Sequence, residues 1–282
     1  MHVPSALLYL FSSSVIMYTN KQVMSVYGLY PTYLMVSQSL LLLVYLFLCR
    51  REKISLRVSK YLLSLAVLNA CNVFFGLLGS THMSVAVFTA LRRVSIGLTL
   101  VGEIVYLKKK KSGPVIACVA FMMAAVAIVA IDDTSASVRG YSFVMLNNLL
   151  TAASSIFSKS VLDSDTSKET VLVMNNAVQL LVAGGISVYH PWEPSVPAFG
   201  FWGASAILGA LIQFSSTWSV QENGPLTQSI LGSSKNVVMS LLSCMHVIDN
   251  DYVFTWINFT ALQMTAVASF LYVYYVKKIS NH

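Results

Sequence analysis

The amino-acid sequence predicts an all-α membrane protein with ten transmembrane helices in two inverted five-helix repeats. Hydrophobic residues make up 56% of the 282 residues and charged residues only 10%, a composition that a water-soluble domain of this length would not tolerate. Apolar stretches run nearly from end to end, and the gaps between them are too short to fold alone. We therefore expect residues 1–282 to form a single polytopic membrane domain, with 1–135 as the first repeat and 136–282 as the second.

Windows of about 18 to 22 mostly apolar residues, the length that crosses a bilayer as a helix, define the expected spans. They lie at 5–24, 30–48, 61–79, 84–106, 113–131, 141–159, 170–189, 199–220, 226–247 and 254–276. Turn-forming residues separate them, as at Tyr30-Pro31 and Gly224-Pro225. No Lys or Arg precedes the first span, so we expect it to be retained rather than removed as a signal peptide.

The charged loops predict the orientation in the membrane. Basic clusters follow the second and fourth spans, at Arg50-Arg51 and Lys108–Lys111, whereas the loop after the fifth span carries Asp132 and Asp133. Basic loops favour the cytosolic side, and with an even number of spans both termini are expected to face the cytosol. The net charge of +7 thus belongs to membrane flanks and does not indicate a nucleic-acid partner.

A weak internal repeat relates the two halves. Lys21 near the end of the first span corresponds to Lys159 at the end of the sixth, and Leu91-Arg92-Arg93-Val94 in the fourth corresponds to Ser234-Lys235-Asn236-Val237 in the ninth. Because an odd number of spans separates the copies, the second must be inverted relative to the first. A binding site at the interface between the copies is the usual consequence.

Three cations lie far from either expected membrane surface: Arg92, Arg93 and Lys235. An isolated cation in hydrocarbon is costly, so these side chains should face a polar cavity or an ionic partner. The nearest acid in a span is Glu103, about 15 Å along the helix from Arg93, and one carboxylate cannot neutralise three cations. An anionic ligand such as a diphosphate would supply the missing charge. The alternative is an arginine buried against helix-terminal carbonyls, where it joins the two halves.

Polar residues at helical spacing form stripes along the sixth and ninth spans. The stripes comprise Asn147, Thr151, Ser154 and Ser158 in the sixth span, and Ser229, Ser233, Asn236, Ser240 and Ser243 in the ninth. Close helix packing in membranes also uses small hydroxyl residues, but it explains Lys235, Asn236 and the pair Asn147-Asn148 poorly. We therefore interpret both stripes as cavity walls.

The seventh span opens with three amide side chains within two turns, at Asn175, Asn176 and Gln179. Amides present paired donors and acceptors that suit the edge of a nucleobase, although hydrogen bonds between helices are an alternative. The sequence contains no metal-ligand spacing, Gly-rich phosphate loop or nucleophile elbow. No catalytic residue, metal or cofactor is predicted, and the chain is not expected to be an enzyme.

Four groups of residues together carry a resemblance to a known family. They are Thr89–Arg93 with Gly102-Glu103, Gly140-Tyr141 with Leu150–Ala153, Gly232–Asn236, and Asp251–Phe259. On these stretches, and along essentially its whole length, the chain resembles the nucleotide-sugar transporter family of the drug/metabolite transporter superfamily. The resemblance implies a ten-helix inverted-repeat fold. It also implies exchange of a cytosolic nucleotide sugar for the lumenal nucleoside monophosphate.

Two motifs of the GDP-mannose branch of this family are altered here. An aromatic-Asn-Asn motif that recognises the base corresponds to Met174-Asn175-Asn176, and a Gly-Ala-Leu-Asn-Lys motif corresponds to Gly232–Asn236, with the Lys-Asn order reversed. The missing aromatic and the reversal look more like the UDP-sugar branch, whereas the doubled asparagine points to GDP-mannose. The predicted substrate-binding residues are Arg92, Arg93, Asn147, Asn148, Asn175, Asn176, Gly232, Ser233, Lys235 and Asn236.

The predicted function is a nucleotide-sugar antiporter that brings a UDP-sugar from the cytosol into the Golgi or ER lumen in exchange for the nucleoside monophosphate. The alternatives are a GDP-mannose (GDP-sugar) transporter of the same fold and an exchanger of phosphorylated sugars or other organic anions. The expected partners are the nucleotide sugar, the nucleoside monophosphate and the lipid bilayer. The sequence leaves open whether the membrane is that of the Golgi or the ER and whether the chain forms a homodimer.

Overall fold

The computed structural model describes residues 2–54, 59–83, 85–132, 138–163, 166–189, 196–232 and 255–280. Every regular element in these ranges is a helix, as the predicted all-α class requires. The α-helices with assigned bounds are α1 (Val3–Ser25), α2 (Pro31–Cys49), α3 (Lys60–Thr81), α4 (Val85–Leu91), α5 (Val94–Val105), α6 (Gly113–Asp132), α7 (Val138–Leu162), α8 (Lys168–Ser187), α9 (Val196–Asn223) and α11 (Trp256–Ser280). A 3-10 helix, η1, covers Arg51–Lys53, and residues 225–232 are also helical.

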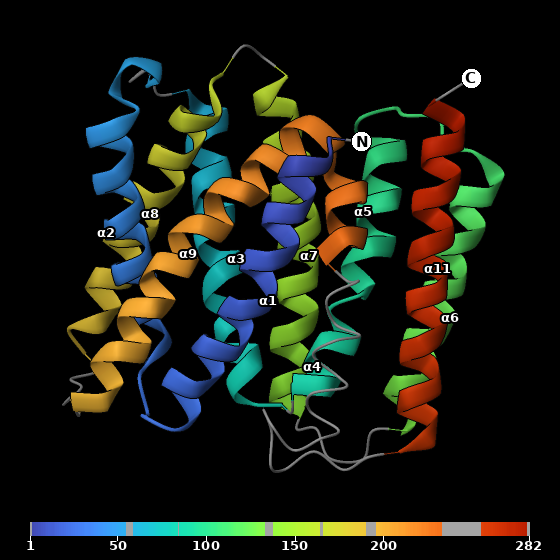
Figure 1. Ribbon diagram of the computed structural model, residues 1–282, viewed down its shortest axis with the longest axis horizontal. Coiled ribbons are helices and arrows are strands. Elements are labelled where there is room, and N and C mark those ends of the chain that lie inside the picture. Colours follow the sequence, from blue (N-terminus) through green and yellow to red (C-terminus); the bar gives the residue numbers. More distant parts are fainter. Residues whose placement is uncertain are drawn as a thin grey trace.

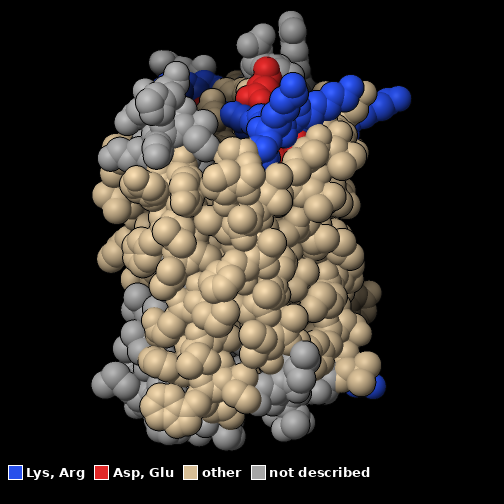
Figure 2. Space-filling model, turned by 90° about the vertical axis from the view of Figure 1, so that its right-hand side faces the viewer, with Lys and Arg blue, Asp and Glu red and all other residues tan. Residues whose placement is uncertain are grey.

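Several of these helices are suited to a bilayer. Helices α2, α3 and α8 and residues Phe199–Asn223 of α9 are long and apolar enough to cross it, and α5 and part of α6 are shorter apolar helices. Large hydrophobic side chains such as Leu48, Leu181 and Phe270 are exposed on the outside of the bundle. On the face in Figure 2 the charged residues gather chiefly at one end and leave a broad uncharged band. The chain is therefore a multi-pass membrane protein.

The helices lie side by side in one bundle (Figure 1). Helices α2, α8 and α9 occupy one side of this view, α5, α6 and α11 the other, and α1, α3 and α7 lie between them. The start of α1, the end of α11, η1 and the loop with Lys108–Lys111 all lie at the same end of the bundle. We call this the basic end, and the opposite one the far end.

The fourth expected span, 84–106, is not one continuous helix, because α4 ends at Leu91 and α5 begins at Val94. In the break, the Ser95 amide donates to the Arg92 carbonyl at 3.2 Å, a contact one residue shorter than the α-helical one. The Leu91 carbonyl, whose α-helical donor would be that amide, instead accepts from Asn148 Nδ2 of α7 at 2.9 Å. No proline or glycine marks this position, so the continuous helix expected from the sequence is wrong here.

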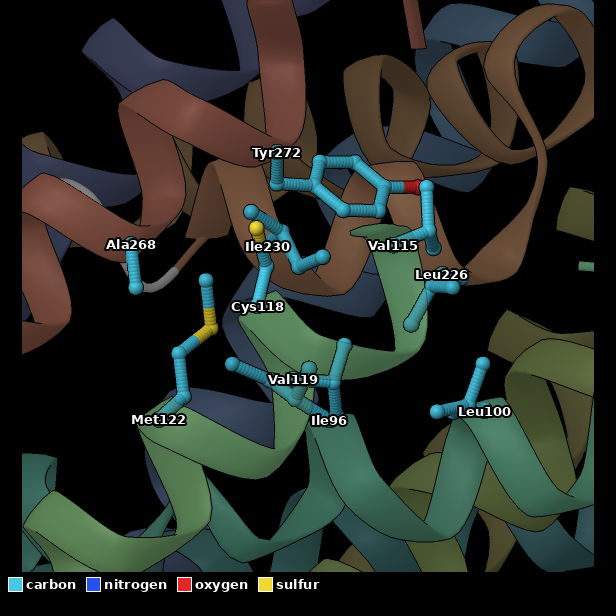
Figure 3. Packing of buried hydrophobic residues seen from close by; sticks show 10 residues of the cluster. All are labelled: Ile96, Leu100, Val115, Cys118, Val119, Met122, Leu226, Ile230, Ala268 and Tyr272. Carbon is cyan, nitrogen blue, oxygen red and sulfur yellow. The ribbon is translucent and has the colours of Figure 1, made fainter. Parts of the chain in front are cut away.

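A buried cluster joins α5, α6, α11 and residues 225–232 (Figure 3). Ile96 of α5, Val119 of α6, Ile230 and Tyr272 of α11 contribute large side chains to it, each less than a tenth exposed. The Tyr272 hydroxyl lies 3.1 Å from the Thr227 hydroxyl, so the polar tip of this tyrosine also has a partner. The cluster fixes the position of the helix at 225–232, which begins one turn from the cavity described below.

Helices α1 and α9 are joined by polar contacts along their length. The Ser12 and Ser215 hydroxyls lie 3.1 Å apart, and Asn20 Oδ1 accepts from the Ser205 hydroxyl at 2.6 Å. Gln38 of α2 adds Nε2 hydrogen bonds to Ser205 at 3.1 Å and to Asn20 at 3.4 Å. Such bonds hold helices together in a bilayer, where burial of apolar side chains gives no comparable driving force.

Candidate substrate-binding site

A cavity of about 260 Å³ lies among α1, α3, the α4–α5 break, α7, α8, α9 and residues 225–232. This volume is just below the range of about 300 to 1,000 Å³ that is usual for small-molecule pockets. Its polar lining residues are Tyr9, Asn69, Asn72, Arg92, Arg93, Ser95, Thr151, Ser154, Ser155, Ser158, Asn175, Gln213, Ser216, Thr217, Gln228 and Ser229. A wall this polar inside a bilayer-embedded bundle indicates a hydrated chamber for a polar solute.

The cavity extends from the basic end to the middle of the bundle. Leu172 lies one turn after the start of α8, Val220 one turn before the end of α9 and Gln228 one turn into the helix at 225–232. All three of these helix ends lie at the basic end (Figure 1). Arg92 and Arg93 lie deeper, at the α4–α5 break.

Apolar side chains fill the bundle beyond the arginines, toward the far end. One cluster contains Phe88, Leu91 and Val144, and another contains Leu29 and Leu34, where α1 turns into α2. These residues are each less than a tenth exposed. The lining of the chamber therefore reaches toward the basic end, and among the described residues apolar clusters lie between the arginines and the far end.

The two arginines differ in their surroundings. Arg93 is 2% exposed, and its Nε, Nη1 and Nη2 have no hydrogen-bond partner among the residues that the structure describes. Arg92 is partly exposed, and its guanidinium carbon lies 5.6 Å from the centre of the Phe88 ring. A buried guanidinium without a counter-charge is destabilising. Among the residues that the structure describes, the two arginines at the inner end of the cavity have no ion-pair partner.

Glu103 does not supply the missing counter-charge. Its carboxylate forms an ion pair with Lys111, and its Oε1 accepts a hydrogen bond from the Leu226 backbone amide at 3.0 Å. Leu226 lies in the first turn of the helix at 225–232, where backbone amides lack intrahelical acceptors. Glu103 therefore caps that helix from α5, and the contacts of its carboxylate with described residues do not include either arginine.

Asn147 and Asn148, adjacent on α7, lie behind the cavity wall rather than in it. Asn147 Nδ2 donates to the backbone carbonyl and to the side-chain Oδ1 of Asn72, both at 2.8 Å. Asn148 Nδ2 donates to the Leu91 carbonyl at 2.9 Å. The sequence predicted both as substrate-binding residues, but the structure does not place them in the cavity lining. They instead hold α3 and the α4–α5 break on α7.

The two adjacent asparagines of α8, Asn175 and Asn176, differ in position. Asn175 lines the cavity, and its buried Oδ1 has no hydrogen-bond partner among the described residues. Asn176 is fully buried and does not line the cavity, and its Nδ2 donates to the Leu172 carbonyl of its own helix at 2.8 Å. The Oδ1 of Asn176 is likewise buried without a partner among the described residues, so the two asparagines differ in that only Asn175 lines the cavity.

Gly232 is the described part of the predicted ninth-span motif, and it lines the cavity. A Cβ at this position would lie 2.7 Å from the Tyr9 hydroxyl, so the glycine lets this tyrosine of α1 approach the helix. Ser233, Lys235 and Asn236 lie outside the described residues, and their binding role stays a prediction.

The polar stripe predicted on the sixth span largely faces the cavity, through Thr151, Ser154 and Ser158. The lining residues that sequence reasoning missed include a tyrosine and four amides, Tyr9, Asn69, Asn72, Gln213 and Gln228. The amides could have been found, because each lies inside an apolar span, where an amide needs a partner or water. Tyr9 gave no such signal, since tyrosines near span ends usually belong to the interfacial belt.

No protein-family model matches the chain, but curated proteins do. The chain is 31% identical over 96% of its length to the UDP-sugar transporter UST74c of Drosophila melanogaster and covers 77% of that protein. It is 28% identical to the nucleotide sugar transporter SLC35D2 of Homo sapiens, with 95% and 84% of the two chains covered. It is 24% identical to the GDP-mannose transporter GONST1 of Arabidopsis thaliana, with 84% and 78% covered.

The fold also has a counterpart of known structure. A solved crystal structure matches with a TM-score of 0.72 at 14% sequence identity, covering 95% of this chain and 97% of that one. This likeness shows a shared fold, and the sequence relatives show the class of protein. The chain belongs to the nucleotide-sugar transporter family, and it is a transporter rather than an enzyme.

Proposed function

We propose that the protein exchanges a cytosolic UDP-sugar for the lumenal nucleoside monophosphate across the Golgi membrane. The observation that carries this proposal is the pair of arginines, Arg92 and Arg93, at the inner end of a polar cavity, where the guanidinium of Arg93 has no hydrogen-bond partner among the described residues. A nucleotide sugar brings a diphosphate with two negative charges, which is the counter-charge that the site lacks. Arg92, the more exposed of the two, contacts the diphosphate, and Arg93 adds its charge from behind.

The base is bound nearer the basic end. Asn175 lines the cavity, and its Oδ1 has no hydrogen-bond partner among the described residues. A nucleobase with an N–H group on its pairing edge can donate a hydrogen bond to this oxygen. Asn69, Gln213 and Gln228 add further amides to the wall at these depths. Relatives at 31% and 28% identity are named as UDP-sugar transporters, and this favours uracil over guanine.

Exchange of these two solutes is nearly electroneutral. The incoming UDP-sugar carries two negative charges on its diphosphate, and a nucleoside monophosphate carries about 1.5 to 2 at neutral pH. The same two arginines can therefore compensate either solute. If the empty transporter changed conformation, its buried arginines would pass through the closed state without a counter-ion. This cost favours obligatory exchange over net transport.

We further propose ten spans in two inverted repeats, with α4 and α5 as one span. The equivalences are α1 with α7, α2 with α8, α3 with α9, α4–α5 with the span that begins at 225, and α6 with α11. Helix contacts support this arrangement: α1 packs on α9 as α7 packs on α3, and α3 packs on α8 as α9 packs on α2. The pairs α2–α8 and α6–α11 map onto themselves. A pseudo-two-fold axis in the membrane plane would produce this pattern.

The orientation in the proposal places the basic end in the cytosol. Lys108–Lys111, η1, the start of α1 and the end of α11 lie there, in agreement with the preference of basic loops for the cytosolic side. The cavity would then face the cytosol, ready to accept a nucleotide sugar, with the lumenal side closed.

Counterflow uptake with the purified protein in liposomes tests this function. Vesicles preloaded with UMP should take up radiolabelled UDP-sugars faster than GDP-mannose or CMP-sugars, and unloaded vesicles should take up little. Arg92→Ala should lower uptake about tenfold to a hundredfold, since a hydrogen bond to a charged group contributes about 1.5 to 3 kcal/mol. Lys235→Ala should abolish exchange while the protein remains extractable and folded.

Two results would contradict the proposal. Preference for GDP-mannose would move the chain to the other branch of the family, which one relative at 24% identity represents. Uptake of sugar phosphates without any nucleobase requirement would replace the proposed cargo with a smaller organic anion.

A further inference from the structure

The side-chain amide of Asn72 on α3 is held in one orientation. Its Oδ1 accepts two hydrogen bonds from α7, from Asn147 Nδ2 at 2.8 Å and from the Thr151 hydroxyl at 2.7 Å. Asn147 Nδ2 also donates to the backbone carbonyl of Asn72 at 2.8 Å. Because Nδ2 cannot accept these bonds, the amide cannot turn over without losing them.

The locked orientation leaves the other half of the amide for the cavity. Asn72 lines the cavity, and no hydrogen bond from its Nδ2 to any described residue is present. The carbonyl oxygen, which an asparagine could otherwise have offered a ligand, already accepts two bonds. Asn72 therefore presents the cavity with N–H donors, which suit oxygen atoms and not other donors.

The structure makes room for the residue that fixes this orientation. Gly76 lies one turn from Asn72 on α3, and a Cβ at Gly76 would lie 2.8 Å from Asn147 Nδ2. The missing side chain therefore allows Asn147 to reach the α3 backbone. Asn147 is 1% exposed and absent from the cavity lining, so it can affect a ligand only through its neighbours.

Asn72 lies at the depth of the arginines. Asn147 holds Asn72, and its chain neighbour Asn148 holds Leu91, directly before Arg92. The two walls of the inner cavity are therefore fixed by one turn of α7. A ligand group that reaches the arginines is rich in acceptor oxygens, as are a diphosphate and the sugar attached to it.

We propose that Asn72 donates a hydrogen bond to an oxygen of the diphosphate–sugar part of the substrate, and that Asn147 is the positioning residue that sets the direction of this donor. The inference rests on the proposed function, because it names one contact within the same site. A purely structural contact between α3 and α7 is the competing explanation, since interhelical amide bonds are common in membranes.

The experiment measures KM, maximal rate and thermal stability for four variants in the counterflow assay. Asn72→Ala removes the donor, Asn147→Ala releases the amide without altering the cavity lining, and the double variant combines them. Gly76→Ala displaces Asn147 from the α3 side. Gly185→Ala is the matched control for a glycine in a membrane helix, because a Cβ there would meet nothing within 4 Å.

We expect Asn72→Ala and Asn147→Ala each to raise KM about fivefold to tenfold, the effect of one lost hydrogen bond, with maximal rates within about twofold of the wild type. The double variant should raise KM no further than Asn72→Ala alone, because both changes remove the same contact. Gly76→Ala should behave like Asn147→Ala, and Gly185→Ala like the wild type.

A structural role would give a different result. Asn147→Ala would then lower the unfolding temperature with an unchanged KM, or the two KM effects would multiply in the double variant, and either outcome overturns the inference. Uridine, which lacks the diphosphate and the sugar attached to it, should compete for uptake equally well in the wild type and in the variants. Failure of the wild-type protein to transport any nucleotide sugar would instead refute the proposed function.

Discussion

Asn148 of α7 donates its side-chain amide to the Leu91 carbonyl, at 2.9 Å, where the fourth span is interrupted. The bond supplies a partner for a backbone group that has none within its own helix, and in a bilayer no water replaces it. The bond therefore stabilises the backbone conformation that places Arg92 and Arg93 at the cavity.

Asn148→Ala should destabilise the protein by about 1 to 3 kcal/mol, because it leaves the Leu91 carbonyl buried and unpaired. Asn176→Ala is the matched control: it removes an equally buried asparagine, but one that bonds to Leu172 within its own helix, where the carbonyl keeps its helical donor. Thermal unfolding in detergent measures both. Equal losses for the two variants would show that the break does not depend on Asn148.

Arg93→Met should raise the unfolding temperature of the substrate-free protein while it abolishes transport. The variant removes a buried charge that has no partner among the described residues, and Met fills similar volume without needing one. Stabilisation by added UDP-sugar should fall as well. Arg139→Met, at an exposed position of α7, is the control and should change neither property. A less stable Arg93→Met protein would mean that the guanidinium is paired.

Glu103→Ala should destabilise the protein by about 3 kcal/mol or more, since it leaves Lys111 without its partner and Leu226 without its acceptor. Glu103→Gln retains an oxygen for the Leu226 amide and should cost less. Unfolding in detergent measures the two variants side by side. If both cost the same, the ion pair matters and the helix cap does not.

Gly209→Ala should destabilise the contact between α2 and α9. A Cβ at Gly209 would clash with the side chain of Gln38, whose amide is held by hydrogen bonds to Asn20 and Ser205. The side chain would have to leave those bonds, at a cost of about 1 to 3 kcal/mol. Gly203→Ala on the same helix has nothing within 4 Å of its Cβ and should be neutral, so unfolding of both variants gives a direct comparison.

Several features of the protein followed from the sequence because they depend on composition and spacing alone. Apolar windows of bilayer length predicted an all-α membrane bundle, and cations inside those windows predicted a polar chamber at Arg92 and Arg93. The sequence also indicated that Glu103 alone cannot neutralise three cations; in the structure its carboxylate contacts Lys111 and Leu226, and Lys235 lies outside the described residues. In a bilayer a buried charge needs a partner or water, so its position in the chain is informative by itself.

Sequence could not divide the asparagines into those that face the cavity and those that support its wall. Asn147, Asn148, Asn175 and Asn176 are the same residue type on apolar helices, yet Asn175 alone of these four lines the cavity. The direction of each amide depends on which carbonyl a neighbouring helix presents, and helical periodicity does not contain that information.

The amino-acid sequence by itself determined that this protein lies in a lipid bilayer, which side of the membrane each loop is expected to face, and which residue types a charged solute would meet. Only the tertiary structure decided where the fourth helix breaks, which amides hold that break and which donor Asn72 turns toward the chamber. The reason is physical: transfer of side chains into a bilayer is a property of each segment, whereas satisfying every buried backbone and amide group requires the particular helices that pack beside it.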